Sequence, residues 1–220
     1  MKQGPNPDIS PLNYFDPEAP IGFLSGDLPH WRQEGVTYFV TFRLADSLPE
    51  AKLTQWRRER DAWMAKHPEP HDESTRIEYY EMFPQRLQEW LDAGSGSCVL
   101  AMTEVGKVVT RALHHFDGVR YRLHESVVAP NHVHAIVFPS GGHSLSRILH
   151  SWKSFTAHEI SKIEKAVCLM REFQSAEWSH RSSDELSVWQ KETFDHIVRN
   201  AASMDKFRKY IQSHNEWRKC

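Results

Sequence analysis

The hydrophobic positions of this chain fall into short β-branched runs that predict strands. The run VTYFVTFRL at 36–44 has almost no polar interruption, as in a buried central strand. Two further runs, at 119–128 and 132–138, are joined by a short Ala-Pro-Asn segment, which predicts a hairpin. A fourth, shorter strand is expected at 187–190.

Apolar residues at helical spacing predict helices that pack on this sheet. They recur every three or four positions in 103–116 and again in 144–165, where a serine after a Gly-rich stretch is the expected cap. A closing helix is expected at about 203–217. The stretch 166–187 has no clear pattern, and only a helical start is expected there.

A charged helical stretch separates the first strand from the rest of this pattern. It begins after Ser47, the expected cap, and its first helix ends before Pro68. A second helix or helix pair follows, with Pro84 as a break or a first-turn residue and Gly94 as the stop. We interpret residues 50–93 as an insertion.

Without the insertion, the element order is β-α-β-β-α-β followed by a terminal helix. This is the ferredoxin-like split βαβ pattern, an α+β fold in which helices cover an antiparallel sheet. Six of the 12 prolines fall within the first thirty positions, so residues 1–35 are predicted to form an extended N-terminal arm. Residues 36–220 are then expected to form a single domain with a helical insertion at about 50–93.

The net charge of −2 gives no indication of a nucleic-acid partner, but the charge is unevenly distributed. Residues 1–142 carry −5 and residues 143–220 carry +3, so the second part of the chain could contact phosphates. No apolar run approaches the roughly 18 residues of a membrane span, and the chain start lacks a secretory pattern. We expect a soluble, cytoplasmic protein.

The densest chemical signal is the histidine pair in the run Asn131-His132-Val133-His134. Side chains two apart on a strand lie on the same face, so both imidazoles are expected side by side. Such a pair can hold a divalent cation if other groups complete the ligand set, although two solvated histidines would give the same spacing. The three cysteines include no CxxC pair, which disfavours a thiolate zinc site and favours Mg²⁺ or Mn²⁺.

The closing helix holds a second signal. Tyr210 and His214 are four residues apart and share one helical face. Residues 199–219 carry a charge of +4, to which Arg208 and Lys209 contribute. A tyrosine has a reference pKa near 10, so it needs a nearby cation to act as a nucleophile at neutral pH. An ordinary solvated helix with a packed tyrosine ring is the competing interpretation.

Together these segments resemble the HUH single-tyrosine transposases, and within them the REP-associated tyrosine transposases of bacteria. The similar segments follow the family order and cover most of residues 30–217. They are VTYFVTFRLADSLP, LDAGSGSC, HHFDGVRYRL, VVAPNHVHAIVFP, LSRILHSWKSFTAHEI, VWQKETFDHIVRN and KFRKYIQSHN.

The resemblance implies an HUH nuclease core in which His132 and His134 ligate Mg²⁺ or Mn²⁺. It further implies that Tyr210 attacks a phosphate of single-stranded DNA near hairpin-forming palindromic repeats, leaving a 5′-phosphotyrosine and a free 3′-OH. Its partner is then single-stranded or hairpin DNA, in the cytoplasm and associated with the bacterial nucleoid. Lys153, Arg208 and Lys209 are the candidates for DNA contact, and both a monomer and a homodimer remain open.

The third metal ligand differs from the family pattern. The family commonly has Asn or Gln four residues after the tyrosine, whereas this chain has His214 there and Asn215 one position later. His214 lies on the same helical face as Tyr210, while Asn215 is rotated by about 100°. We predict His214 as the ligand and keep Asn215 as the alternative.

Two other functions compete with a DNA strand transferase. One is a domesticated, non-catalytic protein that binds DNA hairpins, which the intact histidine pair and Tyr210 disfavour. The other is a nucleotide hydrolase of the histidine-triad type, which would need a third histidine at position 136, where the chain has Ile136.

Overall fold

The computed structural model describes residues 13–20, 22–24, 30–68, 72–177 and 186–217. Its centre is a four-stranded sheet in the order β4-β5-β3-β6, with every neighbouring pair antiparallel. The strands are β3 (Tyr38–Arg43), β4 (Tyr121–Val128), β5 (His132–Pro139) and β6 (Phe194–Ile197). Because β5 lies between β3 and β4, the sheet has the split βαβ arrangement, and the predicted α+β fold is confirmed.

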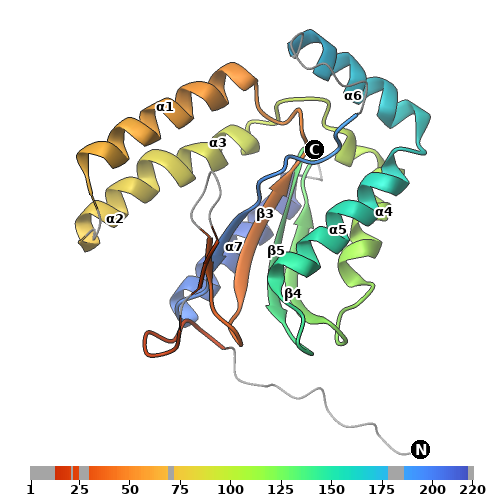
Figure 1. Cartoon of the computed structure of the whole chain (residues 1–220). Coiled ribbons are helices and arrows are strands. Elements are labelled where there is room, and N and C mark those ends of the chain that lie inside the picture. Colours follow the sequence, from red (N-terminus) through yellow and green to blue (C-terminus); the bar gives the residue numbers. More distant parts are fainter. Residues whose placement is uncertain (1–12, 21, 25–29, 69–71, 178–185, 218–220) are drawn as a thin grey trace, which may run out of the picture.

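Helices cover both faces of this sheet. Figure 1 shows α4 and α5 in front of the strands and α7 behind them. Successive side chains of β3 point to opposite faces, so Val40 and Phe42 join the larger core with α4 and α5, whereas Phe39 joins the smaller core with α7. The helices are α4 (Thr103–His114), which follows a short 3₁₀ turn at Val99–Ala101, α5 (Leu145–Ile160) and α7 (Ala201–Trp217).

The predicted insertion is helical and has its own small core. It consists of α1 (Glu50–Lys66), α2 (Glu73–Tyr80), a π-helical turn at Glu81–Gln85 and α3 (Arg86–Asp92). Trp56, Trp63 and Phe83 are buried together in it, and the Trp56 indole N–H donates to the Phe83 carbonyl at 3.1 Å. Pro84 lies in the π-helical turn, where the sequence predicts a break. In Figure 1 these helices extend away from one end of the sheet.

Two helix boundaries differ from the sequence prediction. α1 begins at Glu50 after Pro49 without a side-chain cap, and Ser47 is fully buried instead. The predicted helix 144–165 ends at Ile160, and a separate helix, α6 (Glu164–Glu177), follows. The turn between the two helices allows Ile160 and Met170 both to reach the larger core.

The predicted strand at 187–190 is wrong. Trp189 forms only an isolated bridge with Leu44, and its ring packs against Phe42 with centroids 4.9 Å apart. The fourth strand of the sheet is β6, several residues later, and it pairs with the side of β3 away from β5, where Asp195 lies opposite Val40. The apolar signal at 187–190 therefore marks Val188 and Trp189, which are buried in the larger core.

The N-terminal segment is more structured than an extended arm. β1 (Gly22–Leu24) and β2 (His30–Arg32) form a small antiparallel sheet. The Arg32 guanidinium donates to both carboxylate oxygens of Asp195, at 2.5 and 3.0 Å. The prediction of an extended arm over 1–35 therefore does not hold for the described part of this segment. The two strands are too short to show an apolar pattern in the sequence. Residues 1–12 lie outside the described residues.

His196 is an ionisable residue of β6 whose side chain packs against α7. It lies opposite Phe39 in the sheet, and its ring centroid is 5.7 Å from that of Phe207. Burial lowers the pKa of His196 to about 4, helped by the positive charges of Arg199 and Lys206 and opposed by Asp195. The folded protein therefore holds this imidazole neutral at pH values where an unfolded histidine takes up a proton.

We expect His196 to make the protein less stable in acid. Between the unfolded pKa of ~6.5 and the folded pKa, the free energy of unfolding falls as the pH falls, by up to about 1.4 kcal/mol per pH unit from this residue. His196→Gln should lower this slope in urea titrations between about pH 4 and 6.5. Equal slopes for His196→Gln and the parent protein would contradict the prediction.

Candidate metal centre

The two strand histidines lie together in the smaller core, on the face of β5 that α7 covers. His132 is 1% exposed and His134 is fully buried. Their Nε2 atoms are 2.8 Å apart. The predicted side-by-side arrangement is therefore present, but the pair is buried rather than solvated.

Each histidine has a hydrogen-bond partner on its other ring nitrogen. The Asn131 side-chain amide donates to the carbonyls of Leu91 and Ser95, at 3.2 and 2.9 Å, so its oxygen is left to accept from His132 Nδ1 at 2.7 Å. His132 thus carries its proton on Nδ1 and has a lone pair on Nε2. His134 Nδ1 is 2.8 Å from the Thr41 hydroxyl, which can accept or donate. Thr41 can therefore support the tautomer with a free Nε2 lone pair.

α7 adds the predicted tyrosine and the third histidine. The ring centroids of Tyr210 and His214 are 4.5 Å apart, and that of His134 is 5.0 Å from Tyr210 and 5.1 Å from His214. His214 Nδ1 donates to the Tyr210 carbonyl at 2.9 Å, which turns Nε2 towards the strand histidines. The side chain of Asn215, the alternative ligand, lies outside the described residues.

Asp92 is a fourth group in the cluster, and it is not among the residues that the sequence predicts for the site. Its Oδ1 is 2.9 Å from His214 Nε2 and 3.6 Å from His132 Nε2. The Tyr210 hydroxyl donates to both Asp92 oxygens, at 3.2 and 3.1 Å. The family-like segment LDAGSGSC contains Asp92, but the interpretation of residues 50–93 as an insertion places it apart from the predicted histidine site.

Burial and charge divide the three imidazoles into two kinds. Burial lowers the pKa of His132 to about 4 and that of His134 well below its ordinary value, so both are neutral. Burial also disfavours a charged His214, but the hydrogen bonds to Asp92 and to the Tyr210 carbonyl outweigh it and raise the pKa of His214. A cationic His214 paired with the Asp92 carboxylate gives both of its N–H groups an acceptor.

The cluster has the donor set of a metal site. One ligand atom from each of Asp92, His132, His134 and His214 lies within 4.8 Å of every other. Two ligand atoms bound at right angles, each ~2.1 Å from an ion, are ~3 Å apart, close to the 2.8 Å between the strand Nε2 atoms. Imidazoles with one carboxylate suit borderline divalent ions. This Asp/His cluster could therefore bind a metal ion.

The three residues predicted to contact DNA do not converge on this cluster. Lys153 lies on α5, across the sheet from α7, and its ammonium donates to the carbonyls of Gln190 and Lys191 at 2.6 and 2.9 Å. Burial is the main cause that lowers the pKa of Lys153 to about 8. Arg208 is paired with Glu125 at 3.0 Å, and Lys209 is exposed on α7. Contact with DNA stays a prediction for all three.

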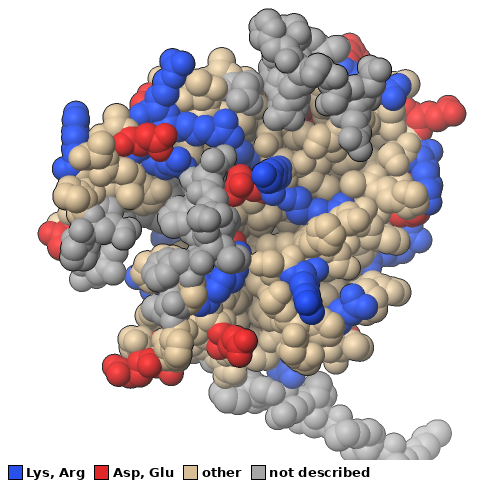
Figure 2. Space-filling model, viewed as in Figure 1, with Lys and Arg blue, Asp and Glu red and all other residues tan. Residues whose placement is uncertain are grey.

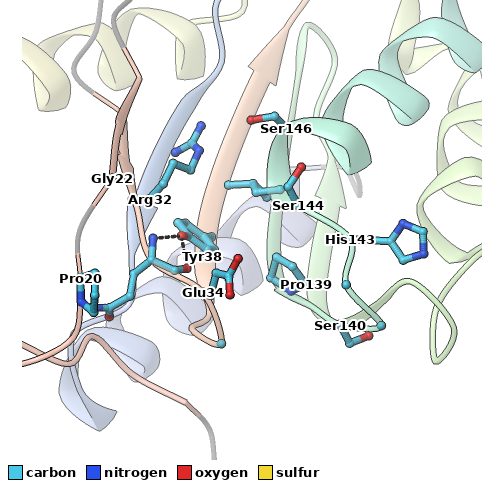
Figure 3. A pocket seen from close by; sticks show the side chains of 15 residues that line it. Pro20, Gly22, Arg32, Glu34, Tyr38, Pro139, Ser140, His143, Ser144 and Ser146 are labelled. Atoms are coloured by element: carbon cyan, nitrogen blue, oxygen red, sulfur yellow. Dashed lines mark hydrogen bonds between the residues drawn. The ribbon is translucent and has the colours of Figure 1, made fainter.

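A pocket of about 820 Å³ lies at the other end of β5 and is not part of the cluster. It is lined by the β1–β2 hairpin, the start of β3 and the loop that leads into α5. Figure 3 shows Arg32 on one side of this pocket and Ser144 and Ser146 on the other. β5 begins at His132 in the cluster and ends at Pro139 in the pocket wall, so the length of the strand separates the two sites.

The surface charges seen from the α4 and α5 side form no single patch. Figure 2 shows Lys and Arg side chains scattered over this face among acidic ones. α7, which carries the basic end of the chain, is behind the sheet in this view.

No helix in the described part of the chain is both long and apolar enough to cross a membrane.

Comparison with known proteins gives likenesses only among solved structures. No protein-family model matches the sequence, and no curated protein matches it. The chain is similar to a REP-associated tyrosine transposase bound to a REP hairpin, with 13% identity, a TM-score of 0.39, and coverage of 86% of this chain and 68% of that one.

A second structure is a "putative transposase from Deinococcus radiodurans R1", with 12% identity, a TM-score of 0.29, and coverage of 83% of this chain and 93% of that one. The first structure belongs to the family that the sequence motifs resemble. Both TM-scores lie below 0.5, so these likenesses alone assign neither a family nor an activity to the chain.

We predict that the metal-free protein binds Mn²⁺ through this cluster. Isothermal titration should show one Mn²⁺ per chain, and His134→Ala should weaken binding by more than about 100-fold, because it removes a ligand rather than a ligand's neighbour. His150→Ala, an exposed histidine on α5, is the control and should bind as the parent protein does. Equal affinity of His134→Ala and the parent protein would rule out the site.

We also predict that Thr41 orients His134. Thr41→Val keeps the shape of the side chain and removes the hydroxyl that fixes the His134 ring. Mn²⁺ affinity should fall by about 10- to 100-fold, as is usual for an outer partner of a ligating histidine. An unchanged dissociation constant would show that packing alone holds the ring.

Proposed function

We propose that this protein is a metal-dependent enzyme that cleaves and rejoins single-stranded DNA. The observation that carries the proposal is the position of the Tyr210 hydroxyl beside the Asp/His cluster. It lies 3.1 Å from an oxygen of Asp92, which is itself in contact with His214 and His132. A tyrosine next to a cation site is what nucleophilic attack on a phosphodiester requires.

In this proposal His132, His134 and His214 hold Mg²⁺ or Mn²⁺. A bound divalent cation would polarise a phosphate oxygen and stabilise the negative charge that develops on it. The neutral state of His132 and His134 supports this role, because only a neutral imidazole has a lone pair for a metal. His214 would bind through Nε2 after losing the proton that it shares with Asp92.

The chemical step forms one bond and breaks another. The Tyr210 oxygen attacks phosphorus, the Tyr210 O–P bond forms, and the bond between phosphorus and the 3′ oxygen breaks. The phenol loses its proton, and the departing 3′ oxygen gains one, which leaves a 5′-phosphotyrosine and a free 3′-OH. Attack by another 3′-OH on the phosphotyrosine reverses these changes and joins two strands.

The resemblance of the sequence motifs supports DNA near hairpin-forming repeats as the substrate. The basic end of the chain is consistent with a polyanion, since residues 199–219 carry +4 in a protein of net charge −2. A strand that must place one phosphate against a side chain on α7 fits unpaired DNA better than a closed duplex.

We predict a covalent protein–DNA adduct that depends on Tyr210. Purified protein incubated with a hairpin oligonucleotide labelled at its 3′ end and Mn²⁺ should give a labelled band that survives denaturing electrophoresis, because the 5′-phosphotyrosine retains the 3′ fragment. Tyr210→Phe should abolish this band and leave DNA binding intact, since only the attacking oxygen is lost. Tyr79→Phe, in the aromatic core of the insertion, is the matched control and should still form the adduct.

Two outcomes would contradict the proposal. An adduct formed by Tyr210→Phe would show that another residue is the nucleophile. Binding of the hairpin by the parent protein without an adduct, at saturating Mn²⁺ and on several palindromic substrates, would favour a non-catalytic hairpin-binding protein instead.

A further inference from the structure

We propose that the inserted helices are part of the catalytic centre, because Asp92 at the end of α3 positions the Tyr210 hydroxyl. This inference rests on the proposed function of Tyr210 as a nucleophile. Asp92 precedes the histidine pair by 40 positions and belongs to a segment outside the β-α-β-β-α-β order. Figure 1 shows that α3 runs from the far end of the insertion back towards the sheet.

Two buried groups of the sheet hold the end of α3 in place. The fully buried Asn131 amide donates to the Leu91 and Ser95 carbonyls, which flank Asp92. The Asp46 carboxylate, just after β3, accepts from the Ser97 backbone N–H at 3.2 Å. The ends of two neighbouring strands therefore fix the turn that follows Asp92.

At Gly96 the turn leaves no room for an ordinary side chain. Gly96 has a φ of +91° and lies against Asp46, so that a Cβ at this position would be 2.3 Å from the Asp46 carbonyl oxygen. Gly94, with a φ of +73°, ends the helix through a bond from its N–H to the Leu91 carbonyl at 3.0 Å. The two glycines of the GSGS sequence therefore allow the tight turn that holds the end of α3 beside β5, where Asp92 lies in the cluster.

The contact with Tyr210 is directional. A carboxylate only accepts hydrogen bonds here, so the phenol must donate, and its nearly equal distances of 3.2 and 3.1 Å centre the hydroxyl between the two oxygens. The ring lies against His134 and His214, with centroids 5.0 and 4.5 Å away. Ring packing restricts the side chain, and Asp92 fixes where the oxygen points.

A phosphate bound at the histidine cluster would lie in line with the Tyr210 oxygen only if Asp92 keeps the hydroxyl in this direction. Misplacement of a reacting atom by about 1 Å costs about 100-fold in rate. Asp92 acts through Tyr210, and it is therefore a positioning residue. Its effect should depend on an acceptor atom at this place, and the side-chain amide of asparagine supplies one.

The test compares Asp92→Ala with Asp92→Asn in the full chain. The rate of adduct formation on a hairpin oligonucleotide at saturating Mn²⁺ should fall about 100-fold in Asp92→Ala and by no more than about tenfold in Asp92→Asn, which keeps an acceptor oxygen. Glu89→Ala removes an exposed carboxylate one turn earlier on α3 and should react at the parent rate.

Two measurements do not depend on activity. With 3-fluorotyrosine incorporated, the Tyr210 signal in the ¹⁹F NMR spectrum is assigned by its loss in Tyr210→Phe. It should shift in Asp92→Ala and stay close to the parent position in Asp92→Asn. Mn²⁺ affinity by isothermal titration should weaken far less in Asp92→Ala than in His134→Ala.

The proposal is overturned if Asp92→Asn reacts as slowly as Asp92→Ala, since the charge and not the acceptor would then matter. It is also overturned if the Tyr210 signal is unchanged in Asp92→Ala, or if Asp92→Ala loses Mn²⁺ as severely as His134→Ala does, which would make Asp92 a ligand. If the parent protein forms no adduct, the proposed function fails, and the NMR comparison still decides whether Asp92 positions Tyr210.

Discussion

The pairing register between β3 and β5 determines where the chemistry of this protein can lie. Thr41 is opposite His134 and Arg43 is opposite His132, so both imidazoles share the face that packs against α7. A slip of one residue would turn them towards the larger core under α4 and α5. The fully buried Val133 and Ala135, which alternate with the histidines, oppose such a slip because they fill that larger core.

The site is assembled from three separate parts of the chain. β5 supplies two neutral imidazoles, α7 supplies a phenol and a third imidazole, and α3 supplies the carboxylate that touches both groups of α7. Asn131 joins two of these parts, since one buried amide orients His132 and holds the backbone on either side of Asp92. The same side chain therefore links the fold of the insertion to the geometry of the cluster.

Electrostatics gives the three histidines different roles although they lie close together. Burial is the main cause that keeps His132 and His134 neutral, and it outweighs the Asp92 carboxylate that lies 3.6 Å from His132 Nε2. His214 contacts Asp92 at 2.9 Å, which stabilises its charged form against the effect of burial. Of the basic residues outside the cluster, Lys153 donates to two backbone carbonyls and Arg208 is paired with Glu125.

Local periodicity determined the helices on the sheet, the central strand, the hairpin and the shared face of His132 and His134, because side-chain direction follows from spacing within one element. The same rule placed Tyr210 and His214 on one face of α7. Asp92, Thr41 and Asn131 became visible only in the tertiary structure, and so did the two short strands near the N-terminus and the true position of β6. The two N-terminal strands pair locally, but three residues each are too few to show an apolar pattern. The others depend on contacts between residues far apart in the chain, such as the 118 positions between Asp92 and Tyr210, and no spacing within a single element encodes such a contact.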